Sequence, residues 1–296
     1  MCGRYVMALR AGELVDALES CGMDEVSLGG ELPGDDAQPW RLSWNVAPTS
    51  TVPILVERYE EGEGRRREVH AARWGLLPRW AESAAFSSKT FNARSETVVS
   101  KPSFRSAVRR RRCAVPVQGY YEWQVTQDEG ASKPVRTPFF IQDAQAPLIL
   151  FAGLYEWWKD PQREAEGQDA WVLSVTILTG PSPQPAEADD DGATGAVEDD
   201  GAAVAADDEG AAQGEAVLTE LAGLHDRLPL AMSPQSAAEW ITPGERSKQE
   251  MEVAVGALRT DAVQVARGWR IHEVDRAVGN VRHDSPELIR PVGTMF

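Results

Sequence analysis

Met1-Cys2-Gly3-Arg4 opens the chain and leads directly into Tyr5–Leu9, a run whose composition predicts a β-strand. Because initiator methionine is normally removed before a small residue, the mature chain would begin with Cys2, which carries an α-amine and a thiol on adjacent carbons. Their unperturbed pKa values, about 7.7–8.0 and about 8.5, leave both groups a nucleophilic fraction at neutral pH. An aldehyde would condense with the amine to an imine, and the thiol would close a thiazolidine ring. Taken alone, Cys2 is more simply an accident of the start site, so the rest of the chain has to decide.

Length and composition predict a globular protein without a metal, a cofactor or a membrane segment. The 296 residues, 42% hydrophobic and including 10 Trp, suffice for one large or two small domains. Apolar runs of about 18 residues and a signal peptide are both lacking, which predicts a cytoplasmic protein. Four histidines show no metal-ligand spacing, and three cysteines without CxxC spacing argue for a reducing compartment and against zinc: Cys2, Cys21 and Cys113.

The net charge of −16 is unevenly distributed along the chain. Eleven acidic residues and no Lys or Arg lie between Pro183 and Glu215, whereas basic residues cluster at Arg65–Arg67, Arg105 and Arg109–Arg112. Local patches rather than the total charge decide whether phosphates bind. The acidic total therefore does not exclude a nucleic-acid partner, although for Arg65–Arg67 an exposed loop is the preferred interpretation.

The pattern of strands and short, separated helices predicts an α+β fold with a mainly antiparallel sheet or barrel-like core. Beyond Tyr5–Leu9, the strands expected include Val52–Glu57, Glu68–Arg73, Cys113–Pro116, Tyr120–Val125, Phe139–Gln142, Leu148–Leu154, Trp171–Thr179 and Trp269–Val274. Helices are expected at Ala11–Cys21, at Phe104–Arg112, after Ser233-Pro234 and opening within Phe91–Glu96, with a loop at Trp74–Trp80. Residues at about 181–216 are acidic and poor in apolar side chains, which predicts a disordered insertion.

Two titratable residues stand out as candidates for proton transfer. Glu122 lies between Tyr121 and Trp123, where flanking rings would desolvate it and raise its pKa; simple exposure on a strand is an equal alternative. His225, two residues before Arg227, has an unperturbed pKa near about 6.5 that suits acid–base work at neutral pH, although a single histidine is more often structural.

Polar and aromatic residues in two further segments have two interpretations each. Asn92 could cap a helix or orient a nucleophile, and Arg94 could fork onto a phosphate. Trp74 and Trp80 could belong to the core or stack on unpaired bases. A Gly-rich phosphate loop, a serine nucleophile elbow and a metal signature are all lacking, so the sequence supports neither a nucleotide-binding nor a metallohydrolase function.

An ordered set of motifs resembles one known family, the SRAP (SOS response-associated peptidase) family of abasic-site processing proteins. The motifs are Met1-Cys2-Gly3-Arg4, Trp44-Asn45-Val46-Ala47-Pro48, Trp74-Gly75, Asn92-Ala93-Arg94-Ser95-Glu96, Tyr121-Glu122-Trp123, His225-Asp226-Arg227-Leu228-Pro229 and Val278-Gly279-Asn280-Val281. The resemblance implies one SRAP domain spanning 2–292, interrupted by the insertion at about 181–216. Leu228 departs conservatively from the methionine usual in the family.

The resemblance also implies a mechanism and its residues. Cys2 would be the nucleophile that links to an abasic-site aldehyde, Asn92 would position it, Glu122 would shuttle protons and His225 would protonate the sugar oxygen. Phosphates would be held by three arginines: Arg4, Arg94 and Arg227. Trp74, with Pro48, would wedge or stack at the lesion.

The expected protein is therefore a monomer that binds abasic sites in single-stranded DNA, with nucleoid association when bound to damage. Its enzyme class would be a peptidase-type hydrolase that removes Met1 autocatalytically, with crosslinking and lyase-like chemistry. Two alternatives remain open. One is a cysteine peptidase acting on other proteins through Cys2, His225 and Glu122, and the other is a non-covalent single-stranded DNA binder.

Overall fold

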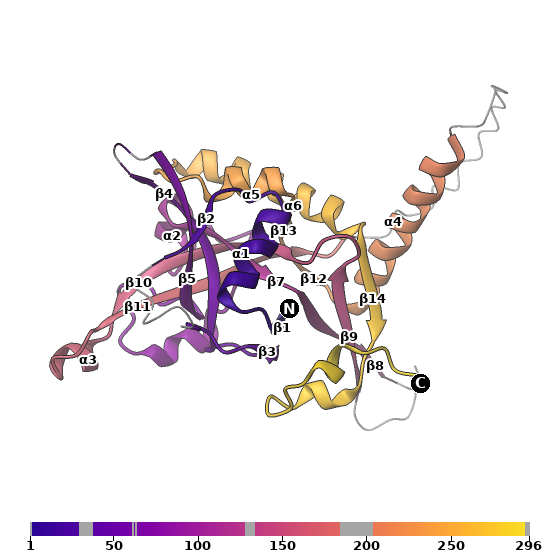
Figure 1. The fold of residues 1–296 in the computed structure, drawn as a ribbon, viewed down its shortest axis with the longest axis horizontal. Coiled ribbons are helices and arrows are strands. Elements are labelled where there is room, and N and C mark those ends of the chain that lie inside the picture. The colour runs from indigo at the N-terminus through magenta and orange to yellow at the C-terminus, as the bar shows by residue number, and fades with distance from the viewer. Residues whose placement is uncertain are drawn as a thin grey trace.

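Two sheets form the centre of the computed structural model, which describes residues 2–29, 38–60, 62, 64–127, 134–183 and 204–293, without the side chains of 204–209. One sheet has the strand order β14-β9-β8-β1-β3. Its members are β1 (Arg4–Met7), β3 (Ser43–Val46), β8 (Gly119–Thr126), β9 (Val135–Asp143) and β14 (Trp269–Glu273). Figure 1 shows β8, β9 and β14 beside the second, larger sheet, with the N-terminus between the two.

The second sheet closes on itself as a five-stranded barrel. The order β11-β10-β7-β4-β5 is completed by pairing of β11 with β5. The barrel strands are β4 (Thr51–Glu60), β5 (Gly64–Trp74), β7 (Arg112–Val117), β10 (Ile149–Lys159) and β11 (Trp171–Pro181). Short strands extend it: β2 (Val26–Leu28), β6 (Asn92–Arg94), β12 (Arg227–Pro229) and β13 (Ala231–Met232). The predicted α+β class with a barrel-like core is confirmed.

Helices surround the sheets (Figure 1). They are α1 (Ala11–Ser20), α2 (Arg105–Arg110), α3 (Pro161–Ala165), α4 (Val204–Leu224), α5 (Pro234–Ile241) and α6 (Lys248–Ala266), with 3₁₀ turns η1 (Ala84–Lys89), η2 (Arg276–Gly279) and η3 (Pro286–Ile289). The predicted start of α5 is confirmed, because the Ser233 hydroxyl accepts the Ser236 N–H at 3.3 Å and Pro234 follows the cap. Within the described ranges, every helix is too short or too polar to cross a membrane.

Strand β1 joins the two halves of the core. It lies between β8 and β3, with Tyr5 opposite both Tyr120 and Val46. Because side chains alternate along a strand, Tyr5 and Met7 enter the main core while Val6 packs in a second cluster with Tyr121. The predicted strand at the head of the chain is confirmed, and its burial fixes the position of Cys2.

The expected helix opening at Phe91–Glu96 is wrong, because this segment contains strand β6. Asn92 pairs in parallel with Ile177 of β11, and the Phe91 carbonyl accepts the Ile177 N–H at 3.1 Å. The unpaired edge of β11 satisfies the backbone of this segment better than a helical turn would. Asn92 is therefore no helix cap, and its side chain is free for another contact.

The expected loop at Trp74–Trp80 begins one residue later than predicted. Trp74 is the last residue of β5 and is fully buried. Its ring packs on Tyr5 at a centroid distance of 4.8 Å. The following Gly75 has φ +130°, and a Cβ there would lie 2.2 Å from the Ser87 carbonyl oxygen, so only glycine allows the chain to turn out of the barrel at this point.

Part of the insertion predicted to be disordered is helical. Residues 204–216 lie in α4, which projects away from the sheets (Figure 1), while residues 184–203 lie outside the described ranges. The sequence of α4 is rich in Ala, Glu and Leu, which are good helix formers, and its last turns bury Leu218, Leu221 and Leu224. The single-domain boundary at 2–292 stays a prediction.

The arginine cluster at 109–112 is engaged within the protein. Arg111 pairs with the buried Glu156 at 2.6 Å, and Arg109 and Arg110 both contact Glu245. Arg112 is 3% exposed, and burial lowers its pKa to about 10. Its guanidinium donates to five backbone carbonyls, those of Val108, Arg109, Trp240, Thr242 and Gly244.

We predict that Arg112→Met lowers the free energy of unfolding by about 2–4 kcal/mol, because buried carbonyls lose their donor. Urea denaturation followed by circular dichroism measures the change. Arg105→Met, at an exposed position in the preceding helix α2, is the matched control and should change stability by less than about 0.5 kcal/mol. Equal effects of the two substitutions would contradict the structural role of Arg112.

Candidate active site around Cys2

Cys2 is held at the head of β1 by the side chain of Asn92. The residue is fully buried, and its carbonyl oxygen accepts a hydrogen bond from Asn92 Nδ2 at 2.7 Å. This contact joins positions 90 residues apart, and β6 supplies it from the edge of β11. The predicted proximity of Cys2 and Asn92 is thus found in the structure.

The thiol of Cys2 lies in an apolar and negatively charged environment. Burial raises its pKa well above the usual range, and the charge of Glu122 acts in the same direction. A raised thiol pKa keeps the sulfur protonated at neutral pH. The nucleophilic thiolate fraction expected from the unperturbed pKa is therefore wrong for the buried state, and reaction requires a base to remove the proton.

Glu122 reaches Cys2 through strand pairing. Arg4 on β1 stands opposite Tyr121 on β8, so Gly3 approaches Glu122 along the same antiparallel register. Glu122 is 6% exposed, and its Oε1 accepts the Trp123 N–H at 3.3 Å. The charge of Glu122 also contributes to the raised pKa of Tyr120, after burial. The alternative of a merely exposed carboxylate on a strand is wrong.

One polar atom of the Asn92 side chain has no hydrogen-bond partner among the described residues. Nδ2 is engaged by Cys2, whereas Oδ1 is buried and accepts no hydrogen bond in the described part of the chain. A buried amide oxygen without a donor is costly. Its position beside Cys2 therefore marks Oδ1 as an acceptor kept for another group.

His225 lies beyond the end of α4 and approaches the same end of β8. Gln124, two residues from Glu122, donates to the Gly223 carbonyl at 3.4 Å, and Ser182 Oγ donates to the His225 carbonyl at 2.6 Å. His225 is half-buried, and across the described residues it has no hydrogen bond to Cys2. The structure thus joins Cys2 directly to Asn92 and closely to Glu122, with His225 farther out.

The ring of His225 has two competing contacts at Nδ1. The Arg227 N–H lies 3.0 Å from Nδ1, and Asp226 Oδ1 lies 2.6 Å from it. A neutral Nδ1 with a lone pair accepts the N–H, whereas a protonated Nδ1 donates to the carboxylate. The backbone contact therefore belongs to the neutral ring, and the contact with the exposed Asp226 carboxylate belongs to the protonated ring.

The three arginines expected to hold phosphates differ in their availability. Arg4 is engaged by Asn45 Oδ1 at 2.8 Å and by the carbonyls of Val278 and Gly279. Arg94 is exposed at the end of β6. Arg227 forms a fork with Glu96, and these hydrogen bonds lower the pKa of Glu96 to about 2.

The aromatic residue assigned to the lesion is not available for stacking. Trp74 is fully buried and its indole N–H donates to the Phe91 carbonyl at 3.0 Å, so in this structure its role is to support the strand that carries Asn92. Trp80 in the following loop is 55% exposed. Pro48 is half-buried next to Ala47, which lines a hollow of about 610 Å³.

Asn45 is a residue to which the sequence analysis gave no role. Its Nδ2 donates to the carbonyls of Val278, Asn280 and His283, while its Oδ1 accepts from Arg4. Two quoted motifs, at 44–48 and 278–281, therefore meet at the base of β1. Both motifs are among those that carry the family resemblance, which was the signal in the sequence. Their contact could not be read from it, because it depends on a fold that brings both ends of the chain together.

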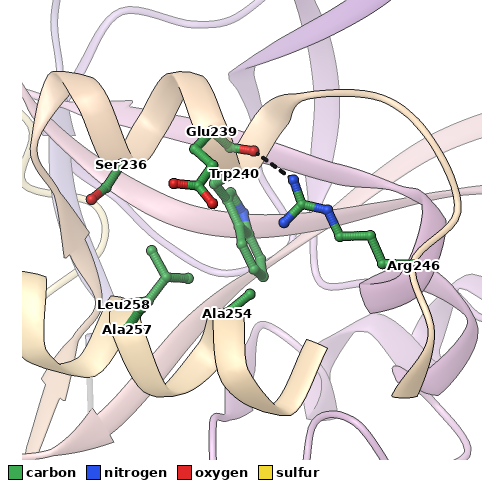
Figure 2. Close-up of a pocket in the computed structure, with 7 residues that line it drawn as sticks. All are labelled: Ser236, Glu239, Trp240, Arg246, Ala254, Ala257 and Leu258. Atoms are coloured by element: carbon green, nitrogen blue, oxygen red, sulfur yellow. Dashed lines mark hydrogen bonds between the residues drawn. The ribbon is translucent and has the colours of Figure 1, made fainter. Parts of the chain in front are cut away.

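Another hollow is lined mainly by residues of α5 and α6. Figure 2 shows a niche between α5 and α6 in which Trp240 forms the floor and Arg246 donates to the Glu239 carbonyl at 3.1 Å. Its volume of about 40 Å³ leaves room for a few water molecules only. Throughout the described ranges, His, Cys, Asp and Glu side chains nowhere gather in a group that could bind a metal.

Comparison with known proteins shows the family to which this chain belongs. The model of the family described as SOS response associated peptidase (SRAP) matches residues 1–188. This chain belongs to the SRAP family. Among curated relatives of this SRAP protein are abasic site processing proteins: YoqW of Bacillus subtilis (26% identity, 98% of this chain and 99% of the relative), YedK of Escherichia coli (27%, 99% and 100%) and HMCES of Pongo abelii (26%, 99% and 76%).

Solved structures share the SRAP protein's fold. A protein from Bacteroides thetaiotaomicron aligns with a TM-score of 0.61 at 15% identity, over 98% of this chain and all of that one. A protein from Bordetella bronchiseptica aligns with a TM-score of 0.55 at 20% identity, over 93% of this chain and all of that one. At these identities the likeness establishes the fold, including the barrel and its helices.

We predict that Cys21 reacts with iodoacetamide before Cys2 in the SRAP protein that retains Met1. Burial raises the thiol pKa of both residues, but Cys21 is partly exposed and Cys2 is not. A raised pKa means that labelling of Cys2 increases only at pH values above the usual thiol range. Peptide mass spectrometry at pH 7–9 measures the order, with the buried Cys113 as the slow reference; faster labelling at Cys2 would contradict its burial.

Proposed function

We propose that this SRAP-family protein processes abasic sites in single-stranded DNA by linking covalently to them through Cys2. The names of its relatives as abasic site processing proteins support the DNA lesion as target. The observation that carries the proposal is the fixed position of Cys2 at the head of β1, with its carbonyl held by Asn92 and its thiol close to Glu122.

The proposed chemistry needs both groups of an N-terminal cysteine. Hydrolysis of the Met1–Cys2 peptide bond releases the α-amine of Cys2. This amine adds to the aldehyde of the ring-opened abasic sugar and loses water, which gives an imine. The thiol then adds to the imine carbon and transfers its proton to the nitrogen, which closes the thiazolidine ring. Ring closure stabilises the link because the hydrolysable C=N bond is replaced by C–N and C–S single bonds in one five-membered ring.

Each neighbour of Cys2 has a role in this scheme. The free Oδ1 of Asn92 accepts a hydrogen of the released amine and so orients its lone pair. Glu122 passes a proton from the attacking amine to the hydroxyl that leaves as water when the imine forms. In the next step it takes the thiol proton, which burial otherwise holds on the sulfur, and passes it to the nitrogen as the ring closes. His225 protonates the ring oxygen of the sugar as it opens.

DNA binding would use a small number of side chains around this site. Arg94 is exposed and available for a phosphate, and Arg227 lies close by across β11. Trp80 offers the exposed ring that stacking requires. We propose the protein as a monomer of the cytoplasm that associates with the nucleoid at damaged DNA.

Removal of Met1 is the proposed peptidase step, and it is intramolecular. A peptidase acting on other proteins does not need its cysteine at the head of the chain, whereas the crosslinking scheme uses both the α-amine and the thiol of Cys2. Burial also keeps the thiol protonated, unlike the low-pKa thiolates of cysteine proteases. These observations favour the crosslinking function over a general cysteine peptidase.

We predict that the mature protein forms an adduct with an oligonucleotide containing an abasic site, and that the adduct survives heating in SDS. Cys2→Ala should abolish the adduct, and Cys2→Ser should leave at most a hydrolysable imine because oxygen closes the ring less stably. Denaturing gels and intact mass measure both. Cys21→Ala is the matched control and should crosslink as wild type.

Glu122→Gln should slow crosslinking by about 10²–10⁴-fold through loss of the proton shuttle. An N-terminal extension that blocks the Cys2 amine should abolish the adduct while leaving the fold intact. A stable adduct from the blocked protein or from Cys2→Ser would contradict the thiazolidine scheme.

We predict opposite phenotypes for the two tryptophans. Trp80→Ala should weaken binding to single-stranded DNA by about 1–3 kcal/mol and leave folding stability nearly unchanged, because its ring is exposed. Trp74→Ala should lower the free energy of unfolding by about 3–5 kcal/mol, because it empties a fully buried site. Fluorescence anisotropy measures DNA binding, and urea denaturation measures stability. If Trp74→Ala weakened DNA binding and left stability unchanged, Trp74 would instead be the stacking residue.

A further inference from the structure

Glu96 fills the guanidinium fork of Arg227. Arg227 NH1 contacts Glu96 Oε1, and Arg227 NH2 donates to Glu96 Oε2 at 2.9 Å. The Ser95 hydroxyl donates to the same Oε2 at 3.2 Å. A carboxylate in this bidentate arrangement occupies the geometry in which arginine binds a phosphate. Glu96 ends the motif Asn92-Ala93-Arg94-Ser95-Glu96, in which the proposed chemistry gives roles to Asn92 and Arg94 but none to Glu96.

The remaining nitrogens of Arg227 offer a phosphate no other approach. NH2 also donates to the carbonyl and the hydroxyl of Thr179, at 2.7 and 3.2 Å, and Nε is buried. The Arg227 side chain is only 10% exposed, whereas that of Glu96 is 39% exposed. A phosphate can therefore engage the fork only where Glu96 now lies, and Glu96 has open solvent into which to withdraw.

Arg94 lies beside the same β11 residue, Thr179, but differs from Arg227 in having no carboxylate partner in the described ranges. Thr179 pairs with Arg94 of β6 on one side and with Pro229 of β12, two residues from Arg227, on the other. Arg94 is exposed, and in the described part of the chain its side chain has no ion pair. Of two arginines flanking one strand position, one is open to an incoming phosphate and the other is already occupied.

We propose that Glu96 is a specificity-determining residue: an internal competitor that occupies the phosphate-binding fork of Arg227 and weakens the hold on undamaged single strands. This rests on the proposed function, in which Arg227 contacts DNA. The carboxylate stays ionised throughout the working pH range, because its pKa is lowered to about 2. An incoming phosphate must displace the Glu96 carboxylate before it can bind the Arg227 guanidinium. Arg227 therefore adds little to the affinity for intact DNA.

The consequence concerns which strands the protein retains. Reversible binding to intact DNA stays weak, and long residence then depends on the bond that only an abasic aldehyde can form with Cys2. The salt dependence of binding reports this directly, since each phosphate neutralised on a single strand steepens the slope of log K against log salt by roughly 0.7.

The test compares Glu96→Gln with wild type for binding to an intact single-stranded oligonucleotide, by anisotropy at several salt concentrations. Glutamine keeps the shape of the side chain but removes the competing charge. We expect about tenfold tighter binding and a slope steeper by roughly 0.7. Glu252→Gln is the matched control, since Glu252 pairs with Lys248 of α6 at 3.5 Å rather than with Arg227, and its affinity should stay within about twofold of wild type.

The combined variant Glu96→Gln/Arg227→Ala should lose the gain, because no freed guanidinium remains. Unchanged or weaker binding by Glu96→Gln, with the wild-type slope, would overturn the proposal and show that Glu96 instead holds Arg227 in position for phosphate. A gain in Glu252→Gln equal to that in Glu96→Gln would also overturn it, as an effect of net charge. Failure of the wild type to crosslink abasic DNA would refute the Cys2 chemistry and leave this comparison on intact DNA unaffected.

Discussion

The insertion of β1 between β8 and β3 is the constraint on which the rest of the structure depends. A chain terminus is normally mobile, yet here the first strand lies in the middle of a sheet and carries Cys2 into the core. Arg4 anchors it by binding Asn45 and the carbonyls of Val278 and Gly279, which belong to the far end of the chain. The reactive residue is therefore positioned by main-chain pairing, and the entropy of ordering it is spent during folding.

The burial that fixes the position of Cys2 also lowers the reactivity of its thiol. The same apolar packing that holds Cys2 raises the pKa of its thiol and those of Tyr5 and Tyr120. A suppressed thiol is protected from casual oxidation and alkylation, because both reactions need the thiolate. The structure thus combines a protected sulfur with a nearby carboxylate, that of Glu122, which takes its proton in the proposed scheme.

Sequence reasoning succeeded where local patterns determine structure and failed where distant contacts do. The strand at Tyr5–Leu9 and the Ser233-Pro234 helix start are readable from neighbouring residues. The strand containing Asn92 is not, because its conformation is imposed by β11, and the burial of Trp74 depends on Tyr5 and Phe91 closing over it. The ordered motifs identified the family and pointed to Cys2, whereas the engagement of Arg4, Arg112 and Arg227 by the protein itself required coordinates.

The distribution of charge fits a protein whose attachment to DNA depends on chemistry more than on electrostatics. Strong non-covalent binders spread many free cations along the strand path, but here the cluster at Arg109–Arg112 is committed to Glu156, Glu245 and backbone carbonyls. An acidic chain with few free arginines near its site has weak attraction for phosphates in general. In the proposed scheme, a covalent bond to one type of lesion supplies the persistence that such a surface lacks, and it supplies selectivity because intact sugars present no aldehyde.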